Sequence, residues 1–527
     1  MIGIRDLAVS IRGRAVLRDV DLRLDAGRVT GLVGESGSGK SMTALAVMGL
    51  LPQGAVAGGE VMLDDRNLLT LPERAMNTIR GRRIAMIFQE PMTALNPLMT
   101  IGDQVAEGLR IHLGMRRDQA RAQARARLDR VGLPAPRFGL DLYPHELSGG
   151  QRQRVAIALA IAGAPELLIA DEPTTALDVT TQAQILDLLR DLVRTEGMSL
   201  LLITHDLAVV AGMADHTAVM RAGEIVEQGP TEALFRTGSH PYTRMLLAAS
   251  RHVPARVAAA TDDTPILQVR AARREYILPR PTPLAPGGVL RAVDDVSFDI
   301  QDGESVGLVG ESGCGKSTLT RAVLGLEPLQ GGEIRLDGDS VQAGHRMPAA
   351  MRAKMQVVFQ DPFGSFDPRW RVDRLLAEPF HLTGRPRDWR ARVAQALDEV
   401  GIEPEAAQRY IHEFSGGQRQ RLAIARALII RPRLIVLDEA VSALDVRVRA
   451  QVLDLLADLR RSHGIAYLFI SHDLGVVRGV TDRVLVMDHG RIVESGPTAG
   501  VMARPAHPVT QRLISAMPEI PAGWDGG

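Results

Sequence analysis

Short apolar runs that end in polar or acidic residues recur along the chain. Six such runs are residues 29–33, 167–170, 200–204, 305–309, 434–437 and 468–471. A short run that is apolar at consecutive positions is typical of a parallel strand buried on both faces. Stretches with helical character, such as 42–50 and 318–326, alternate with these runs. The pattern predicts an α/β fold with a parallel-sheet core.

The second half of the chain repeats the first. The segment Gly-Glu-Ser-Gly-Ser-Gly-Lys-Ser, which ends at Ser41, recurs with one change and ends at Ser317, 276 positions later. Ser-Gly-Gly-Gln, Asp-Glu and a histidine recur at an offset of 267 positions. Strands are expected near 266–269 and 296–300, on either side of a proline-rich loop over 279–288. The repeat predicts a first domain over 1–250, a linker over 251–265, a second domain over 266–518 and a frayed tail over 519–527.

Composition excludes several classes of protein. The 527 residues carry 62 basic and 62 acidic side chains, without the basic excess that nucleic-acid binders usually show. A single cysteine, Cys314, excludes a disulfide framework and a multi-cysteine zinc site. The apolar runs are far shorter than the ~20 residues that cross a bilayer, and the N-terminus lacks the apolar core of a signal peptide. We therefore expect a cytoplasmic chain that acts on a membrane only through a partner.

Both Gly-rich segments lie between a predicted strand and a predicted helix, which is the context of a phosphate-binding P-loop. Only three of the basic residues are lysines, and two of them, Lys40 and Lys316, end these loops. A compact ammonium suits a backbone loop that closes around phosphate. The expected ATP-binding residues are Gly34, Ser36, Gly37, Gly39, Lys40, Ser41 and Met42 in the first copy and Gly310, Ser312, Gly313, Gly315, Lys316, Ser317 and Thr318 in the second.

Three further motifs carry candidate chemistry. Asp171-Glu172 and Asp438-Glu439 end apolar strands, where a carboxylate is poorly placed for stability. In each pair the first acid is expected to hold Mg²⁺ and the second to act as general base on water. Ser-Gly-Gly-Gln precedes a helix in each copy and, taken alone, is also typical of an ordinary helix cap. A histidine ends an apolar run in each copy, and a lone histidine there is usually structural.

These motifs together resemble those of the ABC-type ATPases. The order of P-loop, Gln, Ser-Gly-Gly-Gln, Asp-Glu, Ala-Leu-Asp and His is the same in both copies, and the resemblance covers nearly all of residues 1–518. It implies two tandem P-loop NTPase domains of the ABC type. Each is expected to have a RecA-like parallel-sheet core, an N-terminal antiparallel β subdomain and a helical subdomain that carries the Ser-Gly-Gly-Gln signature.

The resemblance implies a role for each matching residue. The catalytic residues are expected to be Glu172, Glu439, His205 and His472, with the histidines at the γ-phosphate. The expected Mg²⁺ residues are Ser41, Gln89 and Asp171 in one copy and Ser317, Gln360 and Asp438 in the other. The signature residues Ser148, Gly150, Gln151, Ser415, Gly417 and Gln418 are expected to cover ATP held by the opposite domain, with Asp178 and Asp445 linking the two sites. Tyr276 is expected to stack on adenine, where the first copy has Ile11.

Two segments resemble the ATPases of dipeptide, oligopeptide and nickel importers. Residues 90–97, Glu-Pro-Met-Thr-Ala-Leu-Asn-Pro, follow the first Gln. His-Pro-Tyr-Thr at 240–243 ends the first domain, and the second domain has Val509 in place of the tyrosine. An ordinary helix cap is the alternative interpretation of the His-Pro-Tyr-Thr segment.

The resemblance implies a motor that uses ATP and Mg²⁺ at two sites formed by pairing of its own domains. The expected location is the cytoplasmic face of the inner membrane, bound peripherally to two permease subunits and served indirectly by an extracytoplasmic solute-binding protein. The expected cargo is a di- or oligopeptide; nickel, an opine, a sugar or glutathione are alternatives. An exporter motor, and a soluble double ATPase acting on ribosomes or DNA, are the rival classes.

Overall fold

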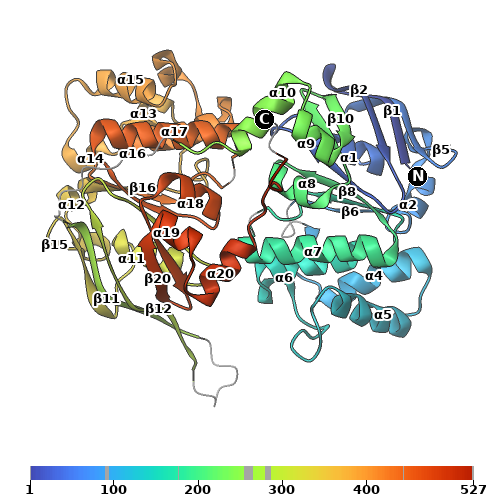
Figure 1. Cartoon of the computed structure of the whole chain (residues 1–527), viewed down its shortest axis with the longest axis horizontal. Helices are drawn as coiled ribbons and strands as arrows, with labels where there is room; N and C mark the ends of the chain where they lie inside the picture. Colours follow the sequence, from blue (N-terminus) through green and yellow to red (C-terminus); the bar gives the residue numbers. More distant parts are fainter. Residues whose placement is uncertain are drawn as a thin grey trace.

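The computed structural model describes residues 2–89, 94–175, 177–254, 265–278, 287–442 and 444–524. The chain forms two similar α/β domains that lie side by side along the long axis of the molecule (Figure 1). Both domains contain one six-stranded and one four-stranded sheet, connected in the same order. The duplication that the sequence predicts is therefore present in the fold.

The large sheet of the first domain is the layer that carries the candidate site. Its strand order is β10-β9-β3-β8-β7-β6, and every neighbouring pair is parallel except β9 with β10. Its strands are β3 (Val29–Val33), β6 (Ile84–Ile87), β7 (Leu167–Asp171), β8 (Ser199–Thr204), β9 (His216–Arg221) and β10 (Glu224–Pro230). Alternate residues of β7 enter two different cores: Ile169 packs with the antiparallel sheet, and Leu168 packs with the helices. This burial on both faces explains why the strand is apolar at consecutive positions.

The smaller antiparallel sheet has the order β2-β1-β4-β5. Its strands are β1 (Ile2–Ile11), β2 (Arg14–Leu24), β4 (Ala55–Leu63) and β5 (Arg66–Asn67). The helices of the first domain are α1 (Lys40–Met48), α2 (Glu73–Ile79), α4 (Ile101–Leu113), α5 (Arg117–Arg130), α6 (Gly149–Ala160), α7 (Val179–Glu196), α8 (Leu207–Met213), α9 (Thr231–Thr237) and α10 (Pro241–Ser250). The expected antiparallel and helical subdomains are both confirmed.

The second domain repeats this architecture. Its strands are β11 (Pro265–Ile277), β12 (Val289–Gln301), β13 (Ser305–Val309), β14 (Gly331–Leu336), β15 (Asp339–Ser340), β16 (Met355–Val358), β17 (Leu434–Asp438), β18 (Ala466–Ile470), β19 (Arg483–Asp488) and β20 (Arg491–Pro497). Its helices are α11 (Lys316–Val323), α12 (Ala349–Lys354), α13 (Val372–Leu376), α14 (Phe380–Thr383), α15 (Trp389–Glu399), α16 (Gly416–Leu428), α17 (Val446–His463), α18 (Leu474–Val480), α19 (Thr498–Ala503) and α20 (Pro508–Ser515).

The two domains exchange contacts in a reciprocal way. The last helix of the first domain, α10, packs on α17 of the second, and the last helix of the second, α20, contacts α7 of the first. Val179, at the start of α7, belongs to a buried apolar cluster that otherwise lies in the second domain. Each domain therefore contributes its C-terminal helix and the helix after its Asp-Glu strand to the interface.

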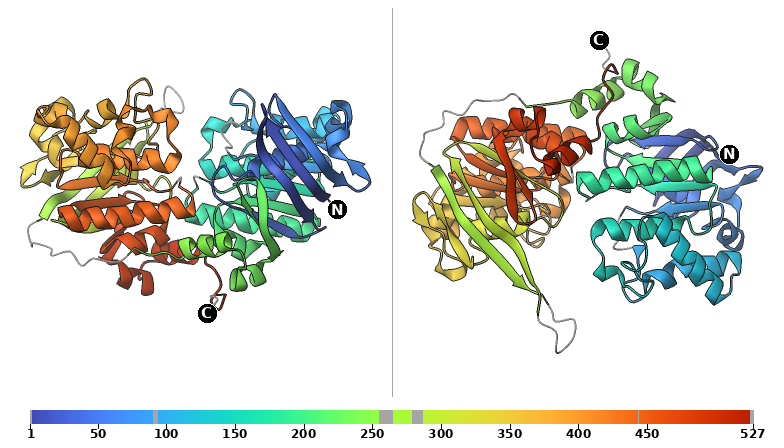
Figure 2. Two further views of the ribbon diagram at one scale, coloured as in Figure 1. Left: turned by 90° about the horizontal axis from the view of Figure 1, so that it is seen from above. Right: turned by 60° about the horizontal axis from the view of Figure 1, so that its bottom comes forward.

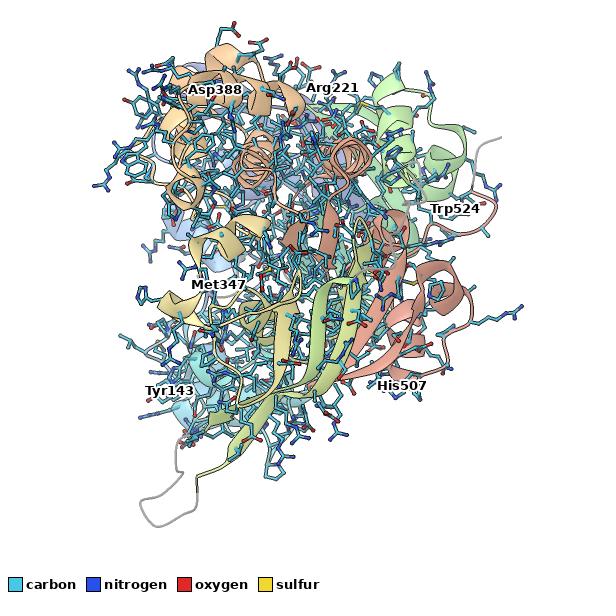
Figure 3. The ribbon with its side chains drawn as sticks, turned by 90° about the vertical axis from the view of Figure 1, so that its left-hand side faces the viewer. Tyr143, Arg221, Met347, Asp388, His507 and Trp524 are labelled. Carbon is cyan, nitrogen blue, oxygen red and sulfur yellow. The ribbon has the colours of Figure 1, made fainter. Side chains whose placement is uncertain are left out.

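Two segments differ from the sequence expectation. Strands β11 and β12 are 13 residues each and form a hairpin that extends beyond the rest of the second domain (Figure 1), whereas only short strands were expected. Residues 519–524, expected to be frayed, cross to the first domain (Figure 2), where Trp524 packs edge-on against Phe235 at 5.7 Å. Figure 3 labels Trp524 on this segment beside the green helices. Apolar burial of Ile520 and Trp524 orders the segment.

Ten residues of the expected linker, 255–264, and most of the proline-rich loop, 279–286, lie outside the described part of the chain. The linker residues that are described dock on the second domain, where the His252 imidazole lies 2.7 Å from the Asp454 carboxylate. Within the described residues, no helix combines the length and the apolar character needed to span a bilayer.

Candidate ATP sites

The two Gly-rich loops hold their lysines in the same way. Each loop follows the central strand of the large sheet, β3 or β13, and leads into α1 or α11. The Lys40 ammonium donates to the carbonyl oxygens of Gly34 and Glu35 at 2.8 and 2.9 Å, and Lys316 does the same to Gly310 and Glu311 at 2.7 and 2.9 Å. Burial lowers the pKa of Lys40, while the nearby Glu172 and Asp171 carboxylates oppose that shift. The loop backbone thus folds around a lysine at the N-terminus of a helix, an arrangement that favours an anion such as phosphate.

A glycine is required at the last loop position before each lysine. Gly39 has φ +110° and Gly315 has φ +111°, which place both in the region that L side chains rarely adopt. A Cβ at Gly315 would also lie 2.0 Å from the Ala292 carbonyl oxygen. These glycines let the chain turn sharply into the helix and leave its first N–H groups pointing at the loop.

Asp171 and Asp438 end β7 and β17. These strands pair with β8 and β18, which lie between them and the P-loop strands β3 and β13. Asp171 is buried, and its Oδ1 has no hydrogen-bond partner among the described residues. Burial raises the pKa of both carboxyls, with a smaller opposing effect of Ser41 on Asp171. A buried carboxylate oxygen without a partner, next to a P-loop hydroxyl, is a suitable ligand position for Mg²⁺, which prefers oxygen donors. The residues present therefore fit the metal that the family resemblance implies.

The following residue, Glu172, is held by three polar side chains. Its carboxylate accepts from Gln89 Nε2 at 2.9 Å and from Thr175 Oγ1 at 2.9 Å, and His205 Nδ1 lies 3.3 Å away. Its backbone φ is +48°, an unusual value for a side chain of this size. Burial by itself raises the pKa of a carboxyl, but the hydrogen bonds from His205 and Thr175 and the charge of Lys40 hold the pKa of Glu172 at about 2. Glu172 is therefore an oriented carboxylate at neutral pH.

The second copy repeats this arrangement with fewer partners. Glu439 has φ +49°, and its Oε1 lies 3.3 Å from His472 Nδ1. The hydrogen bond with His472 lowers the pKa of Glu439; burial works against the protonated form of His472, yet its pKa is raised by Glu439. Gln360 is exposed at the end of β16. Residues 90–93, part of the segment expected to follow the first Gln, lie outside the described residues.

The signature segments start helices α6 and α16. Ser148 and Ser415 cap these helices, and Gln151 and Gln418 complete the reciprocal capping box. A Cβ at Gly150 would lie 2.3 Å from Thr181 Cγ2, and a Cβ at Gly417 would lie 2.2 Å from Val448 Cγ1. The second glycine of each signature is therefore needed for close packing of the signature helix against α7 or α17.

Asp178 and Asp445 cap the helices against which the signatures pack. Asp178 Oδ1 accepts from the Thr181 N–H at 3.0 Å, and Asp445 Oδ1 accepts from the Val448 N–H at 3.0 Å. A small hollow between the domains is lined by Gly34, Glu35 and His205 from the first domain and by Asp445 and Val446 from the second. The structure thus brings Asp445 to the first P-loop, although the two lie far apart in sequence.

Tyr276 lies near the end of β11, where its hydroxyl donates to Glu327 Oε2 at 2.5 Å. The Arg274 guanidinium lies 4.8 Å from the ring centroid and also contacts Glu327, 3.2 Å from Nε to Oε2. The described geometry therefore fixes the orientation of the ring, and adenine stacking remains a prediction.

Three residues at the first P-loop were not predicted as site residues. The hydroxyl of Tyr242, in α10, accepts the Glu35 N–H at 3.2 Å, and Arg447, in α17 of the other domain, lies 3.2 Å from Glu35 Oε1. Glu35 belongs to the first Gly-rich segment and Tyr242 to the His-Pro-Tyr-Thr segment, but nothing in the sequence places either residue beside Arg447. Only the packing of α10 on α17 brings them together.

The chain is similar in sequence to known proteins over most of its length. Residues 17–175 and 293–442 match the ABC transporter family, and residues 226–267 and 493–527 match the family described as oligopeptide/dipeptide transporter, C-terminal region. The glutathione import ATP-binding protein GsiA of Salmonella paratyphi A is 47% identical over 539 residues, which cover 95% of this chain and 86% of that protein. The peptidoglycan transport ATP-binding protein YejF of Agrobacterium fabrum is 47% identical over 542 residues, covering 99% and 97%.

Both P-loops, both signatures and both C-terminal segments lie within or beside these matched regions. The chain therefore belongs to the ABC transporter family, as an ATPase with two fused ATP-binding domains from the oligopeptide/dipeptide importer group.

Proposed function

We propose that this chain drives the uptake of short peptides through a separate pair of permease subunits, by hydrolysing ATP at two sites shared between its domains. The family match shows that the chain is an ATPase motor of an oligopeptide-family importer. The observation that supports shared sites is the position of Asp445 from the second domain in the hollow beside Gly34 and His205 of the first.

In the proposed mechanism, each P-loop binds the ATP triphosphate, with Lys40 or Lys316 neutralising its charge. Ser41 with Asp171, and Ser317 with Asp438, are the residues that would hold Mg²⁺, helped by Gln89 and Gln360. When bound there, Mg²⁺ would supply positive charge that neutralises the triphosphate. The N-terminus of α16 or α6, at Ser415 or Ser148, covers the nucleotide from the opposite domain.

Glu172 and Glu439 orient the water that attacks the γ-phosphate. Hydrogen bonds from His205 and Thr175 hold Glu172 in its ionised, oriented form. Phosphoryl transfer passes through a loose transition state that needs little proton abstraction at the start. The main contribution of Glu172 is therefore to fix the water in line, and His205 fixes the position of Glu172.

A short peptide is the proposed cargo because both copies carry the oligopeptide-type C-terminal segment. The two relatives are named for glutathione, which is itself a short peptide, and for peptidoglycan. Peptide-like solutes are therefore favoured over nickel, a sugar or an opine. The ATPase is proposed to act at the cytoplasmic face of the membrane, and a solute-binding protein is proposed to deliver the cargo from outside.

Purification of the assembled complex tests the transport role. The bait is the full chain with Glu172→Gln and Glu439→Gln, held in Mg-ATP and extracted from native membranes; wild-type chain without nucleotide is the control. We expect two multi-span permease subunits, and a solute-binding protein whose ligand can then be screened. Recovery of ribosomes or DNA-repair factors without any membrane protein would overturn the transport role and leave the ATPase in place.

A further inference from the structure

Glu35 lies at a junction of three parts of the molecule. Its carbonyl oxygen accepts from Lys40 Nζ at 2.9 Å, and its N–H donates to the Tyr242 hydroxyl in the C-terminal extension at 3.2 Å. Its carboxylate lies 3.2 Å from Arg447 Nε in the second domain. The Arg221 guanidinium lies 5.0 Å from the centroid of the Tyr242 ring, a cation–π contact that helps to hold the ring.

The second P-loop has a different set of contacts. Its Glu311 is paired with Arg512 from α20 of its own domain, at 3.8 Å. The residue that corresponds to Tyr242 is Val509, which has no hydroxyl, and the residue that corresponds to Arg447 is Thr180, which has no charge. The charge that faces the loop glutamate therefore comes from the opposite domain at the first P-loop and from the same domain at the second.

The source of the facing arginine matters because the loop glutamate carries a negative charge beside the expected triphosphate. An unpaired carboxylate near Lys40 repels a nucleotide, and the guanidinium 3.2 Å from the Glu35 carboxylate opposes that repulsion. At the first P-loop this neutralisation depends on contact between the domains. At the second it is independent of that contact.

We propose that Glu35, through Arg447 and Tyr242, couples ATP affinity of the first P-loop to contact between the two domains, so that the two ATP sites are unequal. Arg447 and Tyr242 act as positioning residues for the loop. The inference rests on the proposed binding of ATP at both P-loops. It predicts that the first site alone loses affinity when the junction is broken.

The test measures equilibrium binding of Mg-ATP to the full-length chain with one P-loop lysine removed. Lys316→Ala reports the first site, and Lys40→Ala reports the second. In the Lys316→Ala chain, Arg447→Met is expected to weaken binding about two- to fivefold, and Tyr242→Phe about two- to tenfold, from the usual net energies of a partly exposed ion pair and a neutral hydrogen bond. Neither change is expected to alter ATP binding in the Lys40→Ala chain. In that chain, Arg512→Met removes the arginine that pairs with Glu311, and so it is the change that corresponds to Arg447→Met.

Two further readouts separate this role from a general structural effect. Adding Glu35→Gln to Arg447→Met is expected to restore affinity, because it removes the unpaired charge. Raising the salt concentration is expected to shrink the Arg447→Met defect, because salt screens exposed charges. A defect that persists with Glu35→Gln present would mean that Arg447 acts on the nucleotide directly, and would overturn the proposal.

Equal losses at both sites, or no loss from either junction variant, would also overturn this inference while leaving two-site ATP binding intact. Absence of saturable binding in both single-lysine chains would instead overturn the proposed function itself. Melting temperatures of the variants show whether each one folds, and Tyr242→Phe and Arg447→Met provide independent tests.

Discussion

At the scale of single residues, the pKa values of two adjacent acids, Asp171 and Glu172, are shifted in opposite directions. Burial raises the pKa of Asp171, whereas its neighbour Glu172 has a pKa of about 2 because His205 and Thr175 hold the ionised form. The sequence predicts an Asp-Glu pair at the end of an apolar strand. It does not predict the positive φ of Glu172, which turns that side chain from the strand toward His205.

Replacing Glu172 with glutamine keeps the size of the side chain and removes its charge. In a chain whose second site is silenced by Glu439→Gln, we expect Glu172→Gln to lower the remaining ATP hydrolysis about 100-fold or more, which is the scale of loss when a reactant is no longer held in position. Glu166→Gln is the matched control, because Glu166 forms an exposed ion pair with Arg83 at 2.7 Å and lies outside the proposed site. Steady-state phosphate release measures both, and equal rates in the two variants would contradict the assignment.

The pair of His472 and Glu439 makes stability depend on pH. The pKa of His472 is raised in the folded chain, so its contribution is fully present below its unfolded pKa and is lost as pH rises through the folded value. We expect the melting temperature of wild-type chain to decrease over this interval, upward from about pH 6.5. The decrease should be smaller in His472→Gln. If the melting temperatures of the two proteins change equally with pH over this range, the His472–Glu439 pair contributes nothing to the pH dependence of stability.

At the scale of elements, the sequence predicts the strands of the parallel sheet well. Residues 29–33 and 305–309 are strands with those same bounds, because burial on both faces leaves a continuous apolar pattern. The hairpin of β11 and β12 was underestimated, since its outer residues, such as Ile277 and Val289, are exposed and follow no burial pattern. The contact of each signature helix with α7 or α17 could not be predicted, because it depends on the absence of a side chain at Gly150 and Gly417.

A methyl group at Gly417 tests this contact. Gly417→Ala places a Cβ 2.2 Å from Val448 Cγ1, so α16 or α17 must shift. Overpacking of this kind costs about 1–3 kcal/mol, and we expect a lower melting temperature for the second domain. Gly416→Ala is the neighbouring control, because its Cβ would have no heavy atom of the described residues within 4 Å. Equal melting temperatures for the two variants would show that the helices tolerate the methyl group.

At the scale of the whole molecule, the sequence predicts two paired domains but not how they are joined. The reciprocal packing of α10 on α17 and of α20 on α7 involves residues far apart in sequence. The sequence does not predict that the C-terminal segment packs on the first domain, because its few apolar residues show no periodicity. Trp524 nevertheless reaches Phe235 of the first domain, and Arg251, the first linker residue, donates to the Trp524 carbonyl oxygen at 3.2 Å. The domains are therefore linked by this segment as well as by the linker.

Removing the Trp524 side chain tests this second link. Trp524→Ala deletes the ring that packs on Phe235, and we expect a loss of about 1–3 kcal/mol, less than for a fully buried tryptophan. The measurements are thermal unfolding and the rate of cleavage by trypsin near the linker. Glu519→Ala, in the same segment but exposed, is the control. If Trp524→Ala matches this control in both measurements, the segment does not hold the domains together.

The central claim is that one chain forms two hydrolytic ATP sites. The most direct measurement incubates the full-length Glu172→Gln, Glu439→Gln variant with Mg-ATP, removes free nucleotide by rapid desalting, and identifies what remains bound. We expect two molecules of ATP to remain bound per chain, both unhydrolysed. Recovery of ADP would mean that a group other than these glutamates supports hydrolysis, and retention of fewer than two nucleotides would mean that the domains do not form two sites.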